Sequence, residues 1–247
     1  AKQDKANWDA WLTKLAEDDK DGLAAEGVMA AIKAAATDDA VFGLDVGNNT
    51  EWAIRQLPFN HDQRFAMSGW YGTMGFGLPA GLAGQLSFPD QQVWSVSGDG
   101  GYAMVMPDIL TEVKYQLPVV NVVLENKVLG FIAHEKITAG QAPYGIDLLG
   151  ADWAGMADNM GAIGLRATNL AELKTAMAKI KSLQAAGNKR PIVLDAKIKN
   201  VDPIDTSFVP VDPDNFDAKT IAGYRQQYAV DEATQPAFST LLKQVKA

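Results

Sequence analysis

The chain of 247 residues contains no cysteine and only two histidines. The lack of cysteine excludes disulfide bonds, thiolate zinc sites and cysteine nucleophiles. His134 has no second ligand at metal-binding spacing, so we expect it to be a surface residue rather than a zinc ligand. A chain without cysteine is compatible with a reducing compartment, and we expect a cytoplasmic location.

Long hydrophobic runs and basic tracts are also missing. No apolar run is long enough to span a membrane, and the first eight residues do not have the form of a signal peptide. The formal net charge is −8, and Lys and Arg do not cluster. We therefore expect no membrane and no nucleic-acid partner. An anionic ligand would have to be held by local backbone donors and a metal.

What is present is a hydrophobic content of 47%, enough for a substantial core. The patterns predict helices and strands in alternation, with helices over residues 7–20, 24–36 and 169–186 and strands over residues 40–45, 92–97, 119–124 and 191–196. This order predicts an α/β fold, with a mainly parallel central sheet and helices on both faces. We divide the chain into an N-terminal linker and helix (1–25), a main domain (26–200) and a C-terminal extension (201–247).

The most informative segment is Gly98-Asp99-Gly100-Gly101, which directly follows an apolar strand. Glycines let the backbone pass close to a bulky anion, and a helix is expected to begin near Tyr102, so that its free N–H groups point at the same place. Asp99 offers a hard carboxylate oxygen to Mg²⁺. Asn126 follows about 25 residues later, at the end of the next strand, and offers an amide oxygen.

A third strand also ends in polar residues, because Asn48 and Asn49 follow the strand over residues 40–45. In an open parallel sheet, ligands bind at the carboxyl ends of the strands. We therefore expect Asn48, Asn49, Asp99 and Asn126 to converge on one crevice. The plain alternative for the Gly-Asp-Gly segment is a turn that only links a strand to a helix.

The pattern Gly-Asp-Gly, then Asn after about 25 residues, resembles the diphosphate and Mg²⁺ signature of thiamine diphosphate (ThDP) enzymes. The second Asn of that signature is replaced here by Lys127, but the first is the one whose side chain binds the metal. The resemblance therefore implies that Mg²⁺ is held by Asp99, Asn126 and the main-chain carbonyl of Val128.

The same resemblance assigns further residues to cofactor binding. Met74, in a Gly-Thr-Met-Gly context, would be an apolar wedge that supports the bent conformation of the cofactor; otherwise it is a core methionine. The neighbouring Gly75-Phe-Gly77 lacks a preceding strand, so a Rossmann dinucleotide motif is a weak interpretation, and small residues there more often indicate close helix packing. The full set of expected cofactor contacts is Asn48, Asn49, Ser68, Gly72, Met74, Gly98, Asp99, Gly100, Gly101, Asn126, Val128, Leu129 and Gly130.

Within the ThDP enzymes, the chain is most similar to the carboxy-terminal region of bacterial pyruvate oxidases, on stretches such as Asp45-Val-Gly47 and Gly130-Phe-Ile132. Those flavin enzymes convert pyruvate, phosphate and oxygen into acetyl phosphate, carbon dioxide and hydrogen peroxide. The resemblance implies ThDP and Mg²⁺ here and FAD in the parent enzyme. It also implies a homo-oligomer, in which a pyrimidine-binding domain that we do not find in this chain completes the active site.

Two residues after the metal loop would carry the oxidase chemistry. By resemblance, Phe131 would shield the reacting adduct and help electrons pass to the flavin, and Glu135 would lie near the adduct and phosphate. The ordinary alternatives are a core phenylalanine and a charge on a solvated helix face.

Other functions stay open. A quinone-linked pyruvate dehydrogenase or an acetolactate-synthase-like carboligase would use the same diphosphate site. The quinone enzyme needs a membrane-seeking terminal helix, whereas the last helix expected here, over residues 237–247, is short and carries lysines, which favours the oxidase. A non-catalytic cofactor-binding module is the alternative from a different class.

Overall fold

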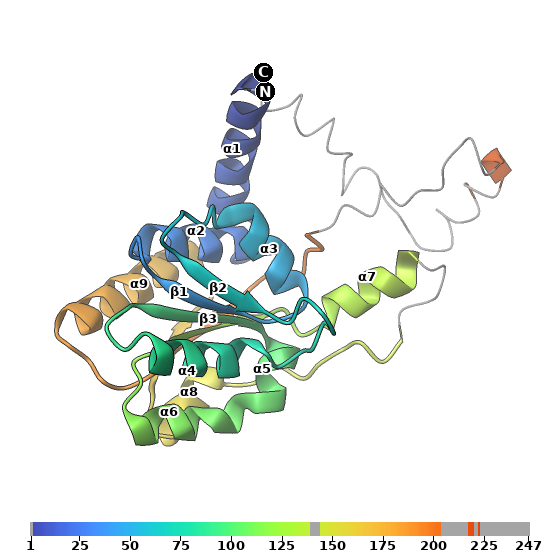
Figure 1. The fold of residues 1–247 in the computed structure, drawn as a ribbon. Coiled ribbons are helices and arrows are strands. Elements are labelled where there is room, and N and C mark those ends of the chain that lie inside the picture. The colour runs from blue at the N-terminus through green and yellow to red at the C-terminus, as the bar shows by residue number, and fades with distance from the viewer. Residues whose placement is uncertain (1, 139–143, 204–216, 220–221, 223–247) are drawn as a thin grey trace.

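The computed structural model describes residues 2–138, 144–203, 217–219 and 222. Figure 1 shows helices packed around one central sheet. The strands are β1 (Val41–Leu44), β2 (Arg64–Met67), β3 (Val93–Gly98), β4 (Val120–Glu125), β5 (Ile163–Ala167) and β6 (Ile192–Lys197). The helices are α1 (Lys2–Glu17), α2 (Ala25–Ala35), α3 (Asn48–Gln56), α4 (Gly77–Ser87), α5 (Asp99–Val105), the 3-10 turn η1 (Met106–Asp108), α6 (Ile109–Tyr115), α7 (Gly130–Thr138), α8 (Trp153–Asn159) and α9 (Leu170–Ala185).

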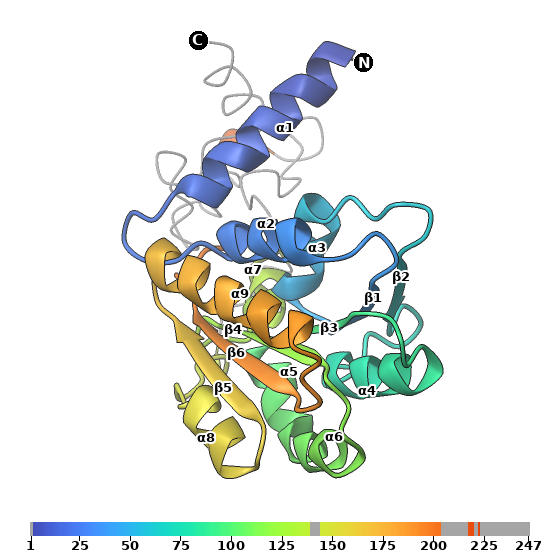
Figure 2. The same ribbon diagram turned by 90° about the vertical axis from the view of Figure 1, so that its left-hand side faces the viewer.

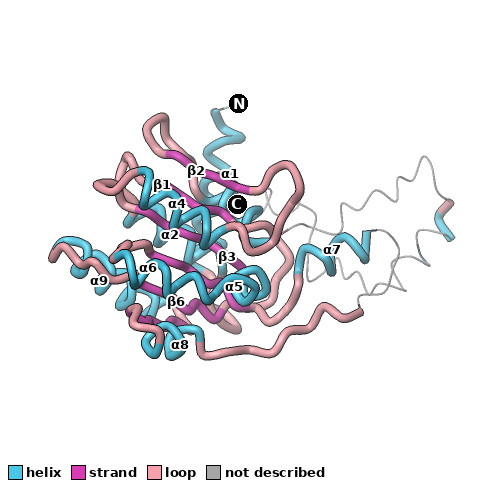
Figure 3. The backbone as a smooth tube through the Cα atoms, turned by 60° about the horizontal axis from the view of Figure 1, so that its bottom comes forward, coloured by secondary structure: helices cyan, strands magenta, loops and turns pink. Residues whose placement is uncertain are grey.

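The sheet has six strands in the order β2-β1-β3-β4-β6-β5, and every neighbouring pair is parallel. The tube in Figure 3 shows the strands running side by side toward the end where α5 and α7 lie. Central strands β3 and β4 are almost continuously buried, as expected for a parallel sheet covered on both faces. The expected α/β fold with a mainly parallel sheet is confirmed.

Helices cover both faces of this sheet, as Figure 2 shows. α2, α3 and α9 lie on one face, over a core that includes Phe42, Trp94 and Leu194. α4, α5, α6 and α8 lie on the other, where Tyr102 packs edge-on against Trp153 at 5.4 Å between ring centroids. The two helical layers bury the central strands of the sheet between them.

Helix α4 lies unusually close to the sheet because glycines form the contact. A Cβ atom added to Gly43 of β1 would lie 2.5 Å from the carbonyl oxygen of Gly77, and one added to Gly81 would lie 2.9 Å from the Cβ of Ser95. The small residues of this segment therefore serve close helix packing, as the sequence indicated.

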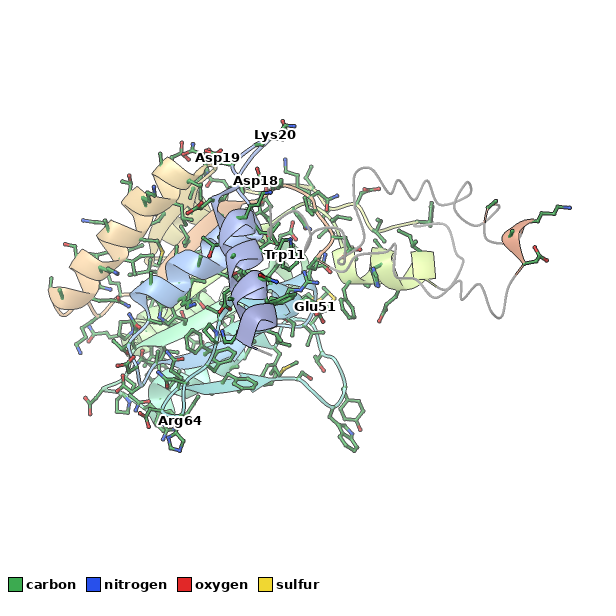
Figure 4. The ribbon with its side chains drawn as sticks, turned by 90° about the horizontal axis from the view of Figure 1, so that it is seen from above. Trp11, Asp18, Asp19, Lys20, Glu51 and Arg64 are labelled. Atoms are coloured by element: carbon green, nitrogen blue, oxygen red, sulfur yellow. The ribbon has the colours of Figure 1, made fainter. Side chains whose placement is uncertain are left out.

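Helix α1 extends beyond the body of the molecule (Figure 1) and is anchored by its middle. Trp11 is buried, with the Arg55 guanidinium 5.7 Å from its ring centroid. In Figure 4, Asp18, Asp19 and Lys20 follow at the end of this helix, and Arg64 lies on the opposite side of the molecule. Lys199 fastens the loop, donating to Asp18 at 2.7 Å. No helix in the described part of the chain is long and apolar enough to cross a membrane.

Several expectations about elements differ from the structure. The first helix runs over Lys2–Glu17 rather than residues 7–20, and α5 begins at Asp99, three residues before the expected start. Strands β2 and β5, and the helix that starts at Asn48, were not predicted. The expected helix over residues 237–247 lies outside the described residues. The proposed domain boundaries stay predictions.

Candidate functional site

A cavity of about 330 Å³ lies at the carboxyl ends of β1, β3 and β4. The chain leaves β1 through α3 to reach β2 on one side, and α4 then carries it to β3 on the other side of β1. The two connections cover opposite faces, so a crevice opens where they diverge, which is where open α/β sheets bind ligands. The lining residues are Val46, Gly47, Asn48, Asn49, Trp52, Tyr71, Gly72, Met74, Gly98, Asp99, Gly100, Gly101, Leu124, Asn126, Val128, Leu129, Gly130, Phe131, Ile132 and Glu135.

The cavity brings together the residues that the sequence singled out, with one exception. Of the expected cofactor contacts and catalytic residues, only Ser68 is not among the lining residues. Its hydroxyl oxygen instead accepts a hydrogen bond from the main-chain N–H of Thr73 at 3.1 Å. Ser68 therefore shapes the loop that carries Gly72 and Met74.

Asp99 is the first residue of α5 and is 4% exposed. Its Oδ1 accepts from the N–H of Gly100 at 3.0 Å, and its Oδ2 accepts from the N–H of Lys127 at 2.8 Å. Burial raises the pKa of Asp99 to about 6, and the nearby charge of Glu125 adds to this rise. A buried carboxylate in this state would be stabilised by a cation.

The loop after β4 is held in place from two sides. Asn126 Oδ1 accepts from the N–H of Val128 at 3.2 Å, so the amide oxygen is turned back toward the loop. Residues 146–148 run alongside, with an antiparallel bridge between Val128 and Asp147 and a hydrogen bond from the N–H of Leu129 to the carbonyl of Ile146 at 2.8 Å. The expected ligands Asn126 and Val128 thus lie on an ordered loop that also touches Asp99 through Lys127.

Lys127 has a φ of 63°, in the left-handed region that Asn adopts more easily than most residues. This is the position at which the chain departs from the ThDP signature. The N–H of Lys127 still donates to Asp99, so the replacement does not remove this hydrogen bond. It places a lysine in a backbone conformation that asparagine adopts more easily.

The two asparagines after β1 differ in their hydrogen bonds. Asn49 Nδ2 donates to the main-chain carbonyl of Asp45 at 2.7 Å, so its amide group ties the start of α3 to the end of β1. Asn48 is also buried, but its Oδ1 has no hydrogen-bond partner among the described residues. An unpaired buried acceptor that faces a cavity points to a ligand or an ordered water.

Glycines let neighbouring side chains pack closely against the turns that line the cavity. A Cβ on Gly100 would lie 2.7 Å from Leu129 Cδ2 and 3.4 Å from Met74 Cε, and a Cβ on Gly130 would lie 2.4 Å from Asn48 Nδ2. Met74 therefore reaches from its loop to the turn after β3. This location is compatible with the apolar wedge that the sequence predicted.

Phe131 and Glu135 lie on α7, which projects from the carboxyl end of the sheet (Figure 1). Phe131 is partly buried and Glu135 is exposed, and both line the cavity. His134 is not the surface residue that we expected: its side chain is 12% exposed, and its Nδ1 lies 2.9 Å from Asp202 Oδ2. That contact joins α7 to the segment after β6.

Sequence reasoning missed two acidic residues at this end of the sheet. Asp45 is fully buried directly after β1, and Glu125, 2% exposed, ends β4 and pairs with Lys197 at 2.8 Å. Both follow apolar runs, so a carboxylate at the end of a buried strand was the available signal.

The residues present fit a metal-bound diphosphate. The donor set of one carboxylate, one amide oxygen and one main-chain carbonyl consists of the hard oxygen ligands that Mg²⁺ prefers. Among the described residues, no group of three or more His, Cys, Asp or Glu side chains could hold a metal ion, so any metal here depends on this mixed set. The unpaired Asn48 Oδ1 leaves a hydrogen-bond acceptor for a donor group of a bound cofactor or for an ordered water.

Comparison with known proteins also indicates a ThDP-binding domain. The family model described as "Thiamine pyrophosphate enzyme, C-terminal TPP binding domain" matches residues 45–196; thiamine pyrophosphate is another name for ThDP. The chain is 38% identical over 197 residues to YdaP of Bacillus subtilis, which is provisionally described as a thiamine pyrophosphate-containing protein. The aligned region covers 78% of this chain and 33% of that protein.

Two further relatives have assigned activities. Identity to pyruvate oxidase of Lactiplantibacillus plantarum is 32% over 239 residues, which is 96% of this chain and 39% of that enzyme. The structure resembles a ThDP-dependent 4-hydroxybenzoylformate decarboxylase of Rhodococcus jostii, with a TM-score of 0.64 and 25% identity over 73% of this chain and 33% of the other. The chain spans between a third and two fifths of the length of these relatives. By the family match and the fold together, this chain belongs to the ThDP enzymes and contains their C-terminal cofactor-binding domain.

Proposed function

We propose that this chain is the ThDP- and Mg²⁺-binding domain of a pyruvate oxidase. The parent enzyme would convert pyruvate, phosphate and oxygen into acetyl phosphate, carbon dioxide and hydrogen peroxide, with FAD bound elsewhere in the enzyme. The observation that carries the proposal is the cavity at the end of β1, β3 and β4, where the Asp99 turn and the Asn126 loop meet through a hydrogen bond.

The choice of an oxidase is supported by the extent of similarity. The pyruvate oxidase alignment covers 96% of this chain, so it includes segments on both sides of the cofactor-binding domain. An acetolactate synthase large subunit of Escherichia coli is similarly identical, at 31%, but over only 65% of the chain. Similarity beyond the shared cofactor site favours the oxidase.

The proposed roles come from the resemblance, and the positions of the residues around the cavity are compatible with them. Asp99, Asn126 and the carbonyl of Val128 would hold Mg²⁺, and Met74 would support the cofactor from the opposite loop. Phe131 and Glu135, on α7 at the rim, would face the 2-keto acid and phosphate. When bound, ThDP supplies an electron sink that lets a 2-keto acid lose carbon dioxide.

Two other activities would use the same cavity. An acetolactate-synthase-like enzyme would join two keto-acid units, and a quinone-linked dehydrogenase would pass electrons to a membrane quinone. The acceptor is determined by the flavin environment, which lies outside this domain. We further propose a homo-oligomer, in which a pyrimidine-binding domain covers this cavity.

Calorimetric titration of the chain with ThDP, in Mg²⁺ and in EDTA, tests the cofactor site. Substituting a second-sphere partner of a metal ligand already costs about 10- to 100-fold in affinity, so Asp99→Ala, which removes a direct ligand, should cost at least about 100-fold. The exposed Asp90→Ala is the control and should bind as the wild type does. Metal-dependent binding that survives in Asp99→Ala would refute the assignment of the metal site.

The oxidase assignment needs the rest of the active site. The chain would be mixed with separately produced pyrimidine- and FAD-binding domains, and pyruvate would be supplied with phosphate and oxygen. Peroxide and acetyl phosphate in equal amounts are expected. Acetolactate without peroxide would replace the oxidase by a carboligase, and quinone-dependent turnover without peroxide would replace it by a dehydrogenase.

A further inference from the structure

Asp45 lies directly after β1 and contacts several walls of the cavity. The proposed function assigns it no role. Its side chain is fully buried, and Oδ1 accepts three main-chain N–H groups, from Val46 at 2.7 Å, Gly75 at 2.8 Å and Phe76 at 3.3 Å. A single carboxylate oxygen thus joins the end of β1 to the loop before α4.

The other contacts of Asp45 reach two further walls. Its main-chain carbonyl accepts from Asn49 Nδ2 at 2.7 Å and from Thr50 Oγ1 at 2.6 Å, which anchors the first turn of α3. Its Oδ2 lies 2.7 Å from where a Cβ on Gly101 would be, so the carboxylate also touches the turn after β3. The turn after β1, the loop before α4 and the turn after β3 therefore meet at this one residue.

The loop before α4 depends on this acceptor. Gly72 and Gly75 have positive φ values of 59° and 82°, and residues 68–76 form no helix or strand. The N-cap residue of α4, Phe76, makes no capping hydrogen bond with its own side chain. A buried N–H group without an acceptor lowers the stability of the folded state. The hydrogen bonds from Gly75 and Phe76 to Asp45 therefore hold the loop next to this side chain.

We propose that Asp45 is a positioning residue for the cofactor cavity, holding the Met74 loop against the turns after β1 and β3 so that Met74 faces the Asp99 turn. It acts through main-chain N–H groups and does not itself touch the cofactor. The inference rests on the proposed function, because its purpose is to place Met74 beneath ThDP. Asp45→Asn and Asp45→Ser grade the interaction: Asn keeps the shape but loses the charge that strengthens the hydrogen bonds, and Ser replaces the carboxylate by a shorter side chain whose hydroxyl oxygen is drawn back from Gly75 and Phe76.

The first measurement is amide hydrogen exchange of the cofactor-free chain, followed by mass spectrometry of a peptide over residues 72–78. Exchange should be about 3- to 10-fold faster in Asp45→Asn and more than 10-fold faster in Asp45→Ser. Asp195→Asn is the matched control, because Asp195 is also a fully buried aspartate but lies on β6, away from the cavity. It should leave this peptide unchanged.

Equal exchange in wild type and Asp45→Asn would overturn the proposal, and this comparison decides alone if Asp45→Ser does not fold. The second measurement is the affinity for ThDP with Mg²⁺, which should fall about 5- to 10-fold in Asp45→Asn and less than twofold in Asp195→Asn. A loosened loop with unchanged affinity would also overturn it. A wild-type chain that does not bind ThDP would count against the proposed function, while the exchange comparison would still decide whether Asp45 holds the loop.

Discussion

Glu112 illustrates how a single buried group makes this protein sensitive to pH. Its side chain on α6 is fully buried, its Oε2 accepts from Asn121 Nδ2 at 2.7 Å, and its Oε1 has no hydrogen-bond partner in the described part of the chain. Burial raises the pKa of Glu112 well above its ordinary value of 4.5. The folded state therefore holds this carboxyl in its neutral form.

The sign of the resulting pH dependence follows from linkage. Because the folded-state pKa of Glu112 is raised, its contribution to stability is complete below pH 4.5 and is lost as the pH rises toward the folded-state pKa. Glu112→Gln removes this ionisation and keeps the size of the side chain. We expect the melting temperature of Glu112→Gln, relative to the wild type, to increase in thermal unfolding as the pH rises above 4.5. A pH-independent difference would show that Glu112 does not titrate in this way.

At the scale of elements, the contact between α4 and β1 decides where the Met74 loop ends. The Cβ of an alanine at Gly43 would lie 2.5 Å from the carbonyl oxygen of Gly77 and 2.6 Å from the N–H nitrogen of Gly81. Both atoms belong to the backbone of α4, so a clash can be relieved only by moving the whole helix away from the sheet.

We therefore expect Gly43→Ala to lower the free energy of unfolding by about 3 kcal/mol, at the upper end of the cost of overpacking. The measurement is urea unfolding followed by circular dichroism. Gly69→Ala is the control, because a Cβ there meets nothing within 4 Å, and it should change stability by less than about 0.5 kcal/mol. Equal stability of the two variants would contradict the close approach of α4.

At the scale of the whole molecule, large exposed side chains lie at the border of the cavity. Trp70 and Tyr71 are 89% and 85% exposed, and Tyr71 lines the cavity. Exposed aromatic side chains that border a binding cavity are typical of a surface that another protein domain covers.

Replacing both aromatics by alanine should leave the stability of the isolated chain within about 0.5 kcal/mol of the wild type, since neither side chain is buried. The same double variant should weaken assembly with the pyrimidine-binding domain at least about tenfold, as loss of aromatic anchors does in protein interfaces. Thermal unfolding and sedimentation velocity measure the two effects. Unimpaired assembly would place the partner domain on another face.

The sequence by itself determined the fold class and predicted which residues gather at the carboxyl ends of β1, β3 and β4. Apolar runs that mark buried parallel strands, and the polar turns after them, are local signals, and the turn after β3 with Asp99 and the loop with Asn126 were readable from them. The family match and the fold confirm the class of protein that these turns predicted.

The two edge strands and the start of α5 were decided by the tertiary structure and not by local sequence patterns. β2 and β5 lie at the two edges of the sheet and are partly exposed, so they lack the continuous apolar runs of the central strands. The start of α5 was predicted late because glycines have low helix propensity, whereas packing and the preceding strand stabilise the helix from Asp99.

The roles of Asp45 and Asn49 could not be read from the sequence either. Asn49 lines the cavity and stays a predicted cofactor contact, and its amide also donates to the main-chain carbonyl of Asp45. Asp45 accepts from residues about 30 positions away. Hydrogen bonds between distant segments depend on where the folded sheet brings the chain, and no local pattern records that. The sequence thus determined which groups could bind a metal diphosphate. The tertiary structure decided which residues join the walls of the cavity, because the hydrogen bonds of Asp45 connect segments that are far apart in the sequence.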